Sequence, residues 1–290
     1  MNYFANSSLA PSSQILFNDR LHKLLPFFPS ITVLLAFPYK TIDRINSIAL
    51  SHTNRHSYIS ACIALFTHNL PPVSSIPNKD HVLLLWKHLL ALNSLPINDH
   101  YDSHSPTSLQ LAKGVSSLSW NDILDKYHSL PNASVQKLLL GMYCLIPPVR
   151  ADFYALHISP NNSSSFPNFI FISPHNISLT IRDFKTASKY GSIHHPSLPT
   201  ELQDQIRLFL KENPERSFLF SHSDNLPFTR HSFTVWANRC FANIFQINIT
   251  ISVLRHLFIS SLPSLSPSQK SSLSSLMGHS ISMQRSYRWK

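Results

Sequence analysis

The sequence has 290 residues, of which 43% are hydrophobic and 11% aromatic, and this is enough apolar material for two globular domains of ordinary size. Lysine and arginine together number 24, against 14 aspartates and glutamates, so the formal net charge is +10 although only 13% of the residues are charged. This bias toward one sign favours a polyanionic partner, while composition alone leaves open a basic protein that has no such partner.

Cysteine is sparse, because Cys62, Cys144 and Cys240 lie far apart and form no C-x-x-C pair. Neither a disulfide framework nor a zinc site is expected, and the pattern favours a reducing, intracellular compartment. That compartment would be the nucleus in a eukaryotic host and the cytoplasm otherwise. The N-terminal residues do not read as a secretory signal. Apolar stretches such as 31–37 and 82–86 are shorter than the roughly 18 residues of a membrane span, so no membrane association is expected.

The first third of the chain is predicted to form an arm and a helical domain. Residues 1–38 are apolar but interrupted by four prolines, which predicts an extended or irregular arm with at most one short helix. Residues 39–95 carry apolar side chains at helical spacing and predict a small helical domain. Basic residues surround these apolar stripes, and we take Lys40, Arg44 and Arg55 as candidates for contacts with a polyanion. An ordinary solvated helix face is the alternative for each of them.

A linker is predicted at residues 96–119, where Pro, Ser, Asn, Asp and His replace the periodic apolar pattern. Asp99, His100, Asp102 and His104 lie together in this segment. Polar linkers carry such groups without binding an ion, so no metal site is predicted.

Residues 120–290 are predicted to form a mixed domain, which makes the chain mainly α with a small antiparallel β-sheet, an α+β fold. An apolar helix over 135–146 ends at Pro147 and Pro148, because proline removes a donor and forces the preceding residue out of helix. Strands expected to form a β-meander follow at 154–158, 168–173 and 177–184. Helices are expected at 201–211, 231–244, 253–261 and 268–276.

The strongest chemical pattern lies near the C-terminus. It consists of Ser252-Val-Leu-Arg-His256, then Leu276-Met-Gly-His279-Ser, and then Tyr287 eight residues after the histidine. Two further motifs precede it: Pro147-Pro-Val-Arg-Ala-Asp-Phe153 at a helix end, and Phe184-Lys-Thr186 in the turn after a strand. In their order and spacing these four motifs resemble the tyrosine recombinases, or phage-type integrases, of mobile elements and viruses.

The resemblance covers residues 120–290 closely. It covers residues 39–95 only because members of the family usually have a helical DNA-clamping domain N-terminal to the catalytic domain. It implies site-specific cleavage and rejoining of double-stranded DNA by four protomers, through a 3′-phosphotyrosine and with neither metal nor other cofactor. A type IB topoisomerase shares this chemistry as a monomer and is the enzymatic alternative.

The resemblance assigns a role to each conserved position of the motifs. Tyr287 takes the place of the nucleophile, whose phosphotyrosine splits one hard step into two reversible ones. Arg150 and Arg255 take the places of two planar, permanently charged arginines that hold the non-bridging phosphate oxygens. Lys185, with Lys189 as the reserve, takes the place of the general acid for the departing deoxyribose oxygen. His279 matches the family's second histidine, which could donate a hydrogen bond to the phosphate or the nucleophile.

One position departs from the family pattern. Ser252 stands where the first histidine is usual, and a serine hydroxyl cannot take a proton near neutral pH. His256 lies one residue after Arg255, about 100° around the helix, so geometry favours a structural histidine over a substitute base. The general base is therefore open, and a catalytically impaired DNA-binding relic is a further alternative.

Overall fold

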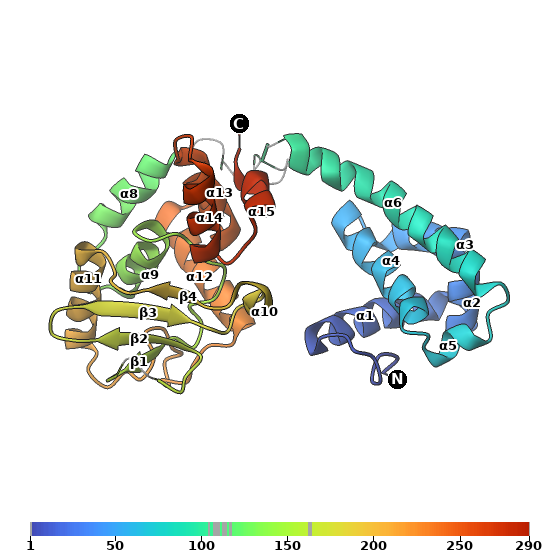
Figure 1. Ribbon diagram of the computed structural model, residues 1–290, viewed down its shortest axis with the longest axis horizontal. Coiled ribbons are helices and arrows are strands. Elements are labelled where there is room, and N and C mark those ends of the chain that lie inside the picture. Colours follow the sequence, from blue (N-terminus) through green and yellow to red (C-terminus); the bar gives the residue numbers. More distant parts are fainter. Residues whose placement is uncertain are drawn as a thin grey trace. The chain divides into compact units, whose positions relative to one another are not determined.

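The computed structural model describes residues 2–103, 105–106, 111, 115, 118–161 and 164–289. The chain divides into two compact units, Met1–Ser103 and His104–Lys290, and each is described by itself (Figure 1). Helices make up most of both units, and the strands that the structure describes form one small sheet in the second unit. The predicted α+β class is confirmed.

The first unit consists of helices packed around one core. Its elements are α1 (Pro11–Leu24), the short turn η1 (Leu25–Phe27), α2 (Ile31–Ala36), α3 (Pro38–Ile48), α4 (His52–Thr67), α5 (Pro71–Ser74) and α6 (Lys79–Ser103). The Trp86 side chain is fully buried in this core, and its indole nitrogen donates to the Leu35 carbonyl at 2.9 Å.

The predicted irregular arm over residues 1–38 is wrong. Pro11 and Pro38 each begin a helix, where the missing N–H costs nothing and the fixed φ suits the helical backbone. Leu21 and Leu24 of α1 are buried in the same core as Trp86, so tertiary packing holds this segment in helical form.

Helix α6 also differs from the prediction, because it continues through Pro96 to Ser103. A proline within a helix frees the carbonyl four residues earlier, here that of Leu92. Half of the Leu92 residue surface is exposed, so the freed carbonyl lies on a face that water can reach. The rest of the predicted linker, including His104, falls mostly outside the described residues. Within the described part of the chain, no cluster of His, Cys, Asp or Glu could hold a metal ion, and no helix is long and apolar enough to cross a membrane.

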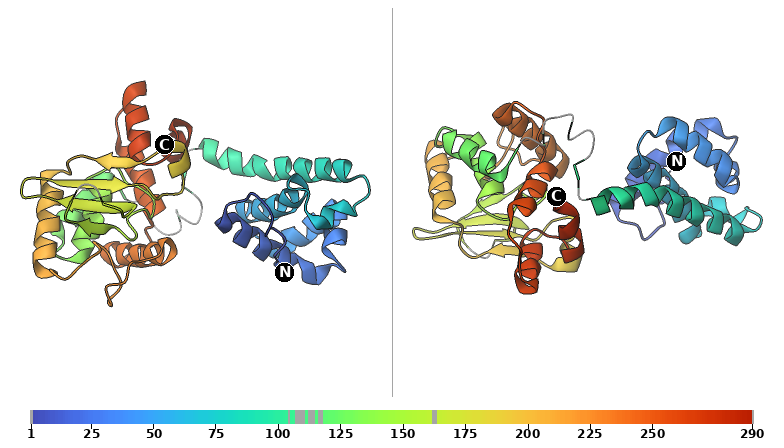
Figure 2. Two further views of the ribbon diagram at one scale, coloured as in Figure 1. Left: turned by 60° about the horizontal axis from the view of Figure 1, so that its bottom comes forward. Right: turned by 90° about the horizontal axis from the view of Figure 1, so that it is seen from above.

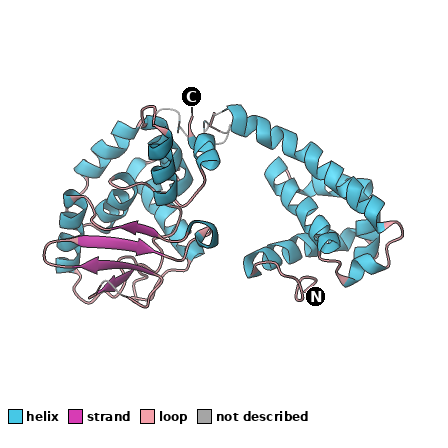
Figure 3. Ribbon diagram, viewed as in Figure 1, coloured by secondary structure: helices cyan, strands magenta, loops and turns pink. Residues whose placement is uncertain are grey.

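The second unit packs helices against a four-stranded sheet. Figure 3 distinguishes its helices from its strands by colour, and Figure 2 shows the same unit in two further views. Its helices are α8 (Trp120–Ser129), α9 (Val135–Cys144), α10 (Ala187–Tyr190), α11 (Thr200–Glu212), α12 (Arg230–Phe245), α13 (Ile251–Ser261), α14 (Pro267–Leu276) and α15 (Ile281–Tyr287). Its strands are β1 (His157–Ser159), β2 (Asn168–Ile172), β3 (Ile177–Ile181) and β4 (Ile193–His195). Helix α9 is buried from Lys137 to Cys144 and packs against α8, α11 and α12.

The sheet is mixed rather than fully antiparallel. Its strand order is β1-β2-β3-β4, and the β2–β3 pair is antiparallel as predicted. Strand β4, which was not predicted, also pairs antiparallel with β3, whereas β1 runs parallel to β2. Backbone hydrogen bonds also join the other side of β1 to a later segment, from the Ile158 amide to the Ser217 carbonyl and from the Leu219 amide to the Leu156 carbonyl, each at 2.9 Å. An antiparallel bridge joins His157 and Phe218, so β1 lies between β2 and this later segment, a long-range pairing that a β-meander does not include.

Candidate active site

Four of the predicted site residues come together in the second unit, although they belong to separate elements. Arg150 follows α9, Arg255 lies in the middle of α13, His279 lies in the turn between α14 and α15, and Tyr287 ends α15. The guanidinium carbon of Arg255 is 4.8 Å from the centre of the Tyr287 ring. The rings of His279 and Tyr287 have centroids 5.4 Å apart.

Helix α13 presents Arg255 from a buried position. The Thr250 hydroxyl caps its N-terminus by accepting from the Val253 amide at 3.3 Å, and the Ile251 amide donates to the side chain of Asn238 at 3.0 Å. Apolar residues of α13 bury the helix on most of its faces, and only 1% of the Arg255 surface is exposed.

The Arg255 guanidinium makes few hydrogen bonds with the protein itself. One terminal nitrogen donates to the Met277 carbonyl at 3.5 Å, while Nε and Nη1 have no hydrogen-bond partner among the described residues. Burial lowers the pKa of Arg255, and the neighbouring Tyr287 opposes this effect. An arginine stays charged even so, and leaving buried donors unpaired costs free energy. The site is therefore suited to receive an anion.

The turn before His279 depends on glycine. Gly278 has φ = 64°, and a Cβ there would lie 3.1 Å from the Phe184 ring and 3.2 Å from Ile193. The Gly278 amide donates to the Ser275 carbonyl and the His279 amide to the Ser274 carbonyl, at 3.1 and 3.0 Å, which is the Schellman pattern of a helix C-terminus. The turn thus ends α14 and packs closely on the β3–β4 hairpin.

His279 is held in one tautomer. Its Nδ1 lies 3.0 Å from the Ser280 carbonyl, and because a carbonyl can only accept, Nδ1 carries the proton. Burial, with smaller contributions from Arg255 and Arg150, lowers the pKa of His279 to about 4. The ring is therefore neutral near pH 7, and its Nε2 is a buried acceptor with no partner among the described residues. This geometry differs from the donor role that the resemblance implies for His279.

Arg150 is tied to the same turn from the other side. Its Nη1 donates to the Gly278 carbonyl at 3.1 Å, and its amide donates to the Asp152 carboxylate at 3.2 Å. Only 2% of the Asp152 surface is exposed, and its Oδ1 lies 2.5 Å from Nη1 of Arg230. Burial raises the pKa of Asp152, while the charges of Arg230, Arg255 and Arg150 oppose the rise. A buried carboxylate thus sits behind both predicted phosphate-binding arginines.

Lys185 lies in the exposed turn between β3 and α10, and no hydrogen bond or ion pair of its ammonium occurs among the described residues. The next residue, Thr186, donates its hydroxyl to the Gly278 carbonyl at 2.7 Å. The Gly278 carbonyl therefore joins the Arg150 loop, the Lys185 turn and the His279 turn. Lys189 is exposed in α10, with its ammonium 5.5 Å from the centre of the Tyr190 ring.

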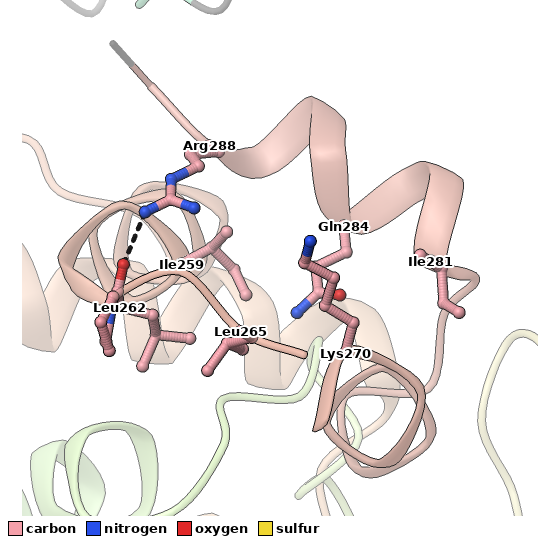
Figure 4. A pocket seen from close by; sticks show the side chains of 8 residues that line it. Ile259, Leu262, Leu265, Lys270, Ile281, Gln284 and Arg288 are labelled. Carbon is pink, nitrogen blue, oxygen red and sulfur yellow. Dashed lines mark hydrogen bonds between the residues drawn. The ribbon is translucent and has the colours of Figure 1, made fainter. Parts of the chain in front are cut away.

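The segment carrying Tyr287 is anchored to α13 of the same chain. The His256 ring donates from Nδ1 to the Tyr287 carbonyl at 2.9 Å and stacks on Trp289, with centroids 4.5 Å apart. The Trp289 amide donates to the Ser260 hydroxyl at 2.8 Å. Arg288 donates to the Leu262 carbonyl at 2.6 Å, across the pocket that α15 forms with the end of α13 (Figure 4).

The remaining predicted positions lie apart from this cluster. Ser252 is exposed at the start of α13, and no hydrogen bond of its hydroxyl is found among the described residues. In the first unit, Lys40 is exposed on α3, the Arg44 guanidinium lies 3.4 Å from the centre of the Phe27 ring, and Arg55 donates from Nε to the Ala49 carbonyl at 2.8 Å.

Sequence reasoning assigned no role to four residues that build the site. Asp152 and Gly278 both stand inside the quoted motifs, so each could have been found by asking what a buried acid or a glycine does there. Thr186 also follows Lys185 directly. Trp289 carried no signal, because its role depends on the fold bringing α15 beside α13.

No family model matches the chain, and no curated protein matches it in sequence. Among solved structures, the crystal structure of XerA recombinase is similar to the chain, with a TM-score of 0.42 and 14% sequence identity, covering 98% of this chain and 90% of that chain. At this level of similarity the residues of the site, rather than the likeness, carry any statement about chemistry.

Proposed function

We propose that this chain is a site-specific DNA recombinase of the tyrosine-recombinase type, which cleaves and rejoins duplex DNA through a covalent phosphotyrosine at Tyr287. The observation that carries the proposal is the buried Arg255, whose guanidinium lies over the Tyr287 ring and has two nitrogens without a hydrogen-bond partner among the described residues. The His279 ring, whose Nε2 also has no partner there, lies on the same Tyr287 ring. A buried cation with free donors next to a nucleophile is what stabilisation of a phosphoryl-transfer transition state requires.

In the proposed reaction, Arg255 and Arg150 bind the non-bridging oxygens of the scissile phosphate. The Tyr287 oxygen attacks phosphorus, and the bond from phosphorus to the 5′ oxygen of deoxyribose breaks. Lys185 gives its proton to that departing oxygen. A 3′-phosphotyrosine and a free 5′-hydroxyl strand result, and the reverse attack by a 5′-hydroxyl rejoins the DNA.

The proton of Tyr287 also needs an acceptor, and we assign it to Nε2 of His279. Ser252 cannot take a proton near neutral pH, whereas the neutral His279 ring has a free acceptor directed away from the Ser280 carbonyl. His256 is engaged with the Tyr287 backbone and serves to hold the segment. The departure from the family pattern at position 252 therefore does not leave the site without a base.

The DNA partner, the assembly of four protomers and the contacts of Lys40, Arg44, Arg55 and Lys189 with the DNA backbone are parts of the same proposal. The net charge of +10 supports a polyanionic partner.

A suicide DNA substrate, nicked so that the cleaved end diffuses away, tests the proposal. The wild-type chain should form a denaturant-resistant protein–DNA adduct whose peptide maps to Tyr287 by mass spectrometry. Tyr287→Phe should keep DNA affinity and form no adduct, because it lacks only the hydroxyl. DNA binding without any wild-type adduct would identify a relic, and an adduct at Tyr143, Tyr154 or Tyr190 would refute the assignment.

A further inference from the structure

A second charged cluster lies behind the Lys185 turn and has no part in the mechanism above. Arg230, the first residue of α12, lies between two carboxylates, with Nη1 at 2.5 Å from Asp152 and Nη2 at 3.7 Å from Asp183. Its guanidinium carbon is 5.0 Å from the centre of the Tyr154 ring. The Tyr154 hydroxyl donates to the Asp183 carboxylate.

Each oxygen of the half-exposed Asp183 carboxylate thus has one partner. Oδ1 faces Arg230, and Oδ2 accepts from Tyr154. The backbone of Asp183 is fixed as well, because its amide donates to the Asn168 side chain at 2.8 Å and its carbonyl accepts from the same side chain at 3.0 Å. Asp183 is therefore held on the side of Arg230 and Tyr154.

Lys185 stands two residues after Asp183 in the same exposed turn. A carboxylate so near in the chain is the natural ion-pair partner for its ammonium, because opposite charges within about 4–6 Å attract. Lys185 and Asp183 form no such pair, and the carboxylate contacts Arg230 and Tyr154 instead. An ammonium paired to a carboxylate holds its proton more tightly and points away from a substrate, and either effect would weaken a general acid.

We propose that Arg230, together with Tyr154, holds Asp183 away from Lys185, so that the Lys185 ammonium stays free to reach the departing oxygen of the scissile phosphate. Arg230 is then a positioning residue, because in the proposed reaction it acts through Asp183 and not on the scissile phosphate. This inference rests on the proposed function for its role in cleavage, but the restraint on Asp183 itself does not depend on any activity.

The test compares cleavage of two suicide substrates, one with the normal oxygen and one with sulfur at the bridging 5′ position. A thiolate leaves without a proton, so only the oxygen substrate needs Lys185. Arg230→Met frees Asp183 and should lower the rate on the oxygen substrate by roughly 10²-fold more than on the sulfur substrate, the scale that displacement of a catalytic group produces. Adding Asp183→Asn should restore the ratio of the two rates, because the amide cannot capture the ammonium.

Arg230→Met also leaves the buried Asp152 without its partner, so Tyr154→Phe is the second variant. It removes one contact of Asp183 and keeps the Asp152–Arg230 pair, and it should shift the rate ratio in the same direction by a smaller factor. Arg239→Met serves as the control, since Arg239 is exposed on the same helix. Equal losses on both substrates, or an Arg230→Met rate ratio that Asp183→Asn does not restore, would overturn the inference.

A second readout needs no cleavage. Acylation of lysines by acetic anhydride, mapped by mass spectrometry, should modify Lys185 several-fold more slowly in Arg230→Met than in the wild type, with Lys189 as the internal reference. The rate should return when Asp183→Asn is added. If the wild type forms no adduct but the variants show this labelling pattern, the proposed function is overturned and the restraint on Asp183 stands. If the labelling of Lys185 is the same in Arg230→Met as in the wild type, the restraint is overturned.

Discussion

At the scale of single residues, the proposed phosphate-binding side chains lie in an environment that makes them poor contributors to stability. Arg255 is charged, buried and only partly hydrogen-bonded. A buried polar group without partners destabilises a fold, and such groups persist where a ligand completes them. Stability and function should therefore respond in opposite directions when this residue is changed.

Arg255→Met tests that expectation. Methionine fills similar space without the unpaired donors, so the melting temperature should be unchanged or higher. Adduct formation should fall by roughly 10²-fold or more, the usual loss when one transition-state donor is removed. Arg239→Met, which removes an exposed arginine, is the matched control and should retain wild-type cleavage. A large drop in melting temperature for Arg255→Met would mean that Arg255 stabilises the fold without any ligand.

The buried histidines predict how stability changes with pH. Burial lowers the pKa of His279 and of His195 to about 4, while an unfolded chain titrates near its ordinary value of about 6.5. Between these values the unfolded state binds more protons, so the free energy of unfolding should fall as the pH drops from about 6.5 to about 4, by at most about 3 kcal/mol for each ring.

Urea denaturation at pH 7 and at pH 4.5 measures this fall. His279→Asn and His195→Asn should each make it smaller, whereas His231→Asn, at an exposed position, should not. If all three variants show the wild-type difference between the two pH values, the two rings are not buried in their neutral form.

At the scale of elements, the sequence predicted the longer helices of the second unit well, but it missed α1, the end of α6 and the short elements. Helix α12 was expected at 231–244 and runs from Arg230 to Phe245, because its apolar face and its Thr229 cap are both local signals. Helix α15 has seven residues with little periodicity, and tertiary contacts with α13 hold it. Strand β4 is three residues long and forms only by pairing with β3.

The same distinction explains what was predictable in the site. The residue types and their order marked Arg150, Arg255, His279 and Tyr287, since each stands in a motif. How they come together was not predictable, because the Gly278 carbonyl that binds Arg150 and Thr186 is placed by how the α14–α15 turn packs against Phe184 and Ile193.

Gly278→Ala should disrupt this junction. Alanine would have to adopt the left-handed backbone at φ = 64°, and its Cβ would lie against the Phe184 ring. We therefore expect a loss of about 1–3 kcal/mol in the free energy of unfolding. The double variant with Phe184→Leu should recover part of the loss, because the ring atoms in contact are gone. Urea titrations of the wild type, the two single variants and the double variant give the coupling free energy between positions 278 and 184. Strictly additive losses would contradict the contact.

At the scale of the whole molecule, the net charge of +10 should dominate association with DNA. Each neutralised phosphate releases close to one counterion, so the affinity for duplex DNA should fall with a log–log slope of several units as salt increases. Fluorescence anisotropy between 50 and 200 mM salt, about the range over which such losses are large, measures the slope. Replacing Lys40 by Ala should reduce the slope by about one unit if that residue contacts a phosphate, and a slope near zero would contradict DNA as the partner.

The anchoring of Tyr287 determines how much of the binding energy with DNA would be needed to orient the reacting groups. One helix, α13, supplies the guanidinium of Arg255 and, through His256, grips the backbone of Tyr287. The proposed nucleophile and the proposed phosphate-binding group are therefore brought together when the chain folds, so little orientational entropy would be left to lose on binding DNA. Each protomer should carry a high effective molarity of its own nucleophile, so mixing Tyr287→Phe with Arg255→Ala protein should restore no cleavage, and cleavage per bound protomer should not depend on protein concentration.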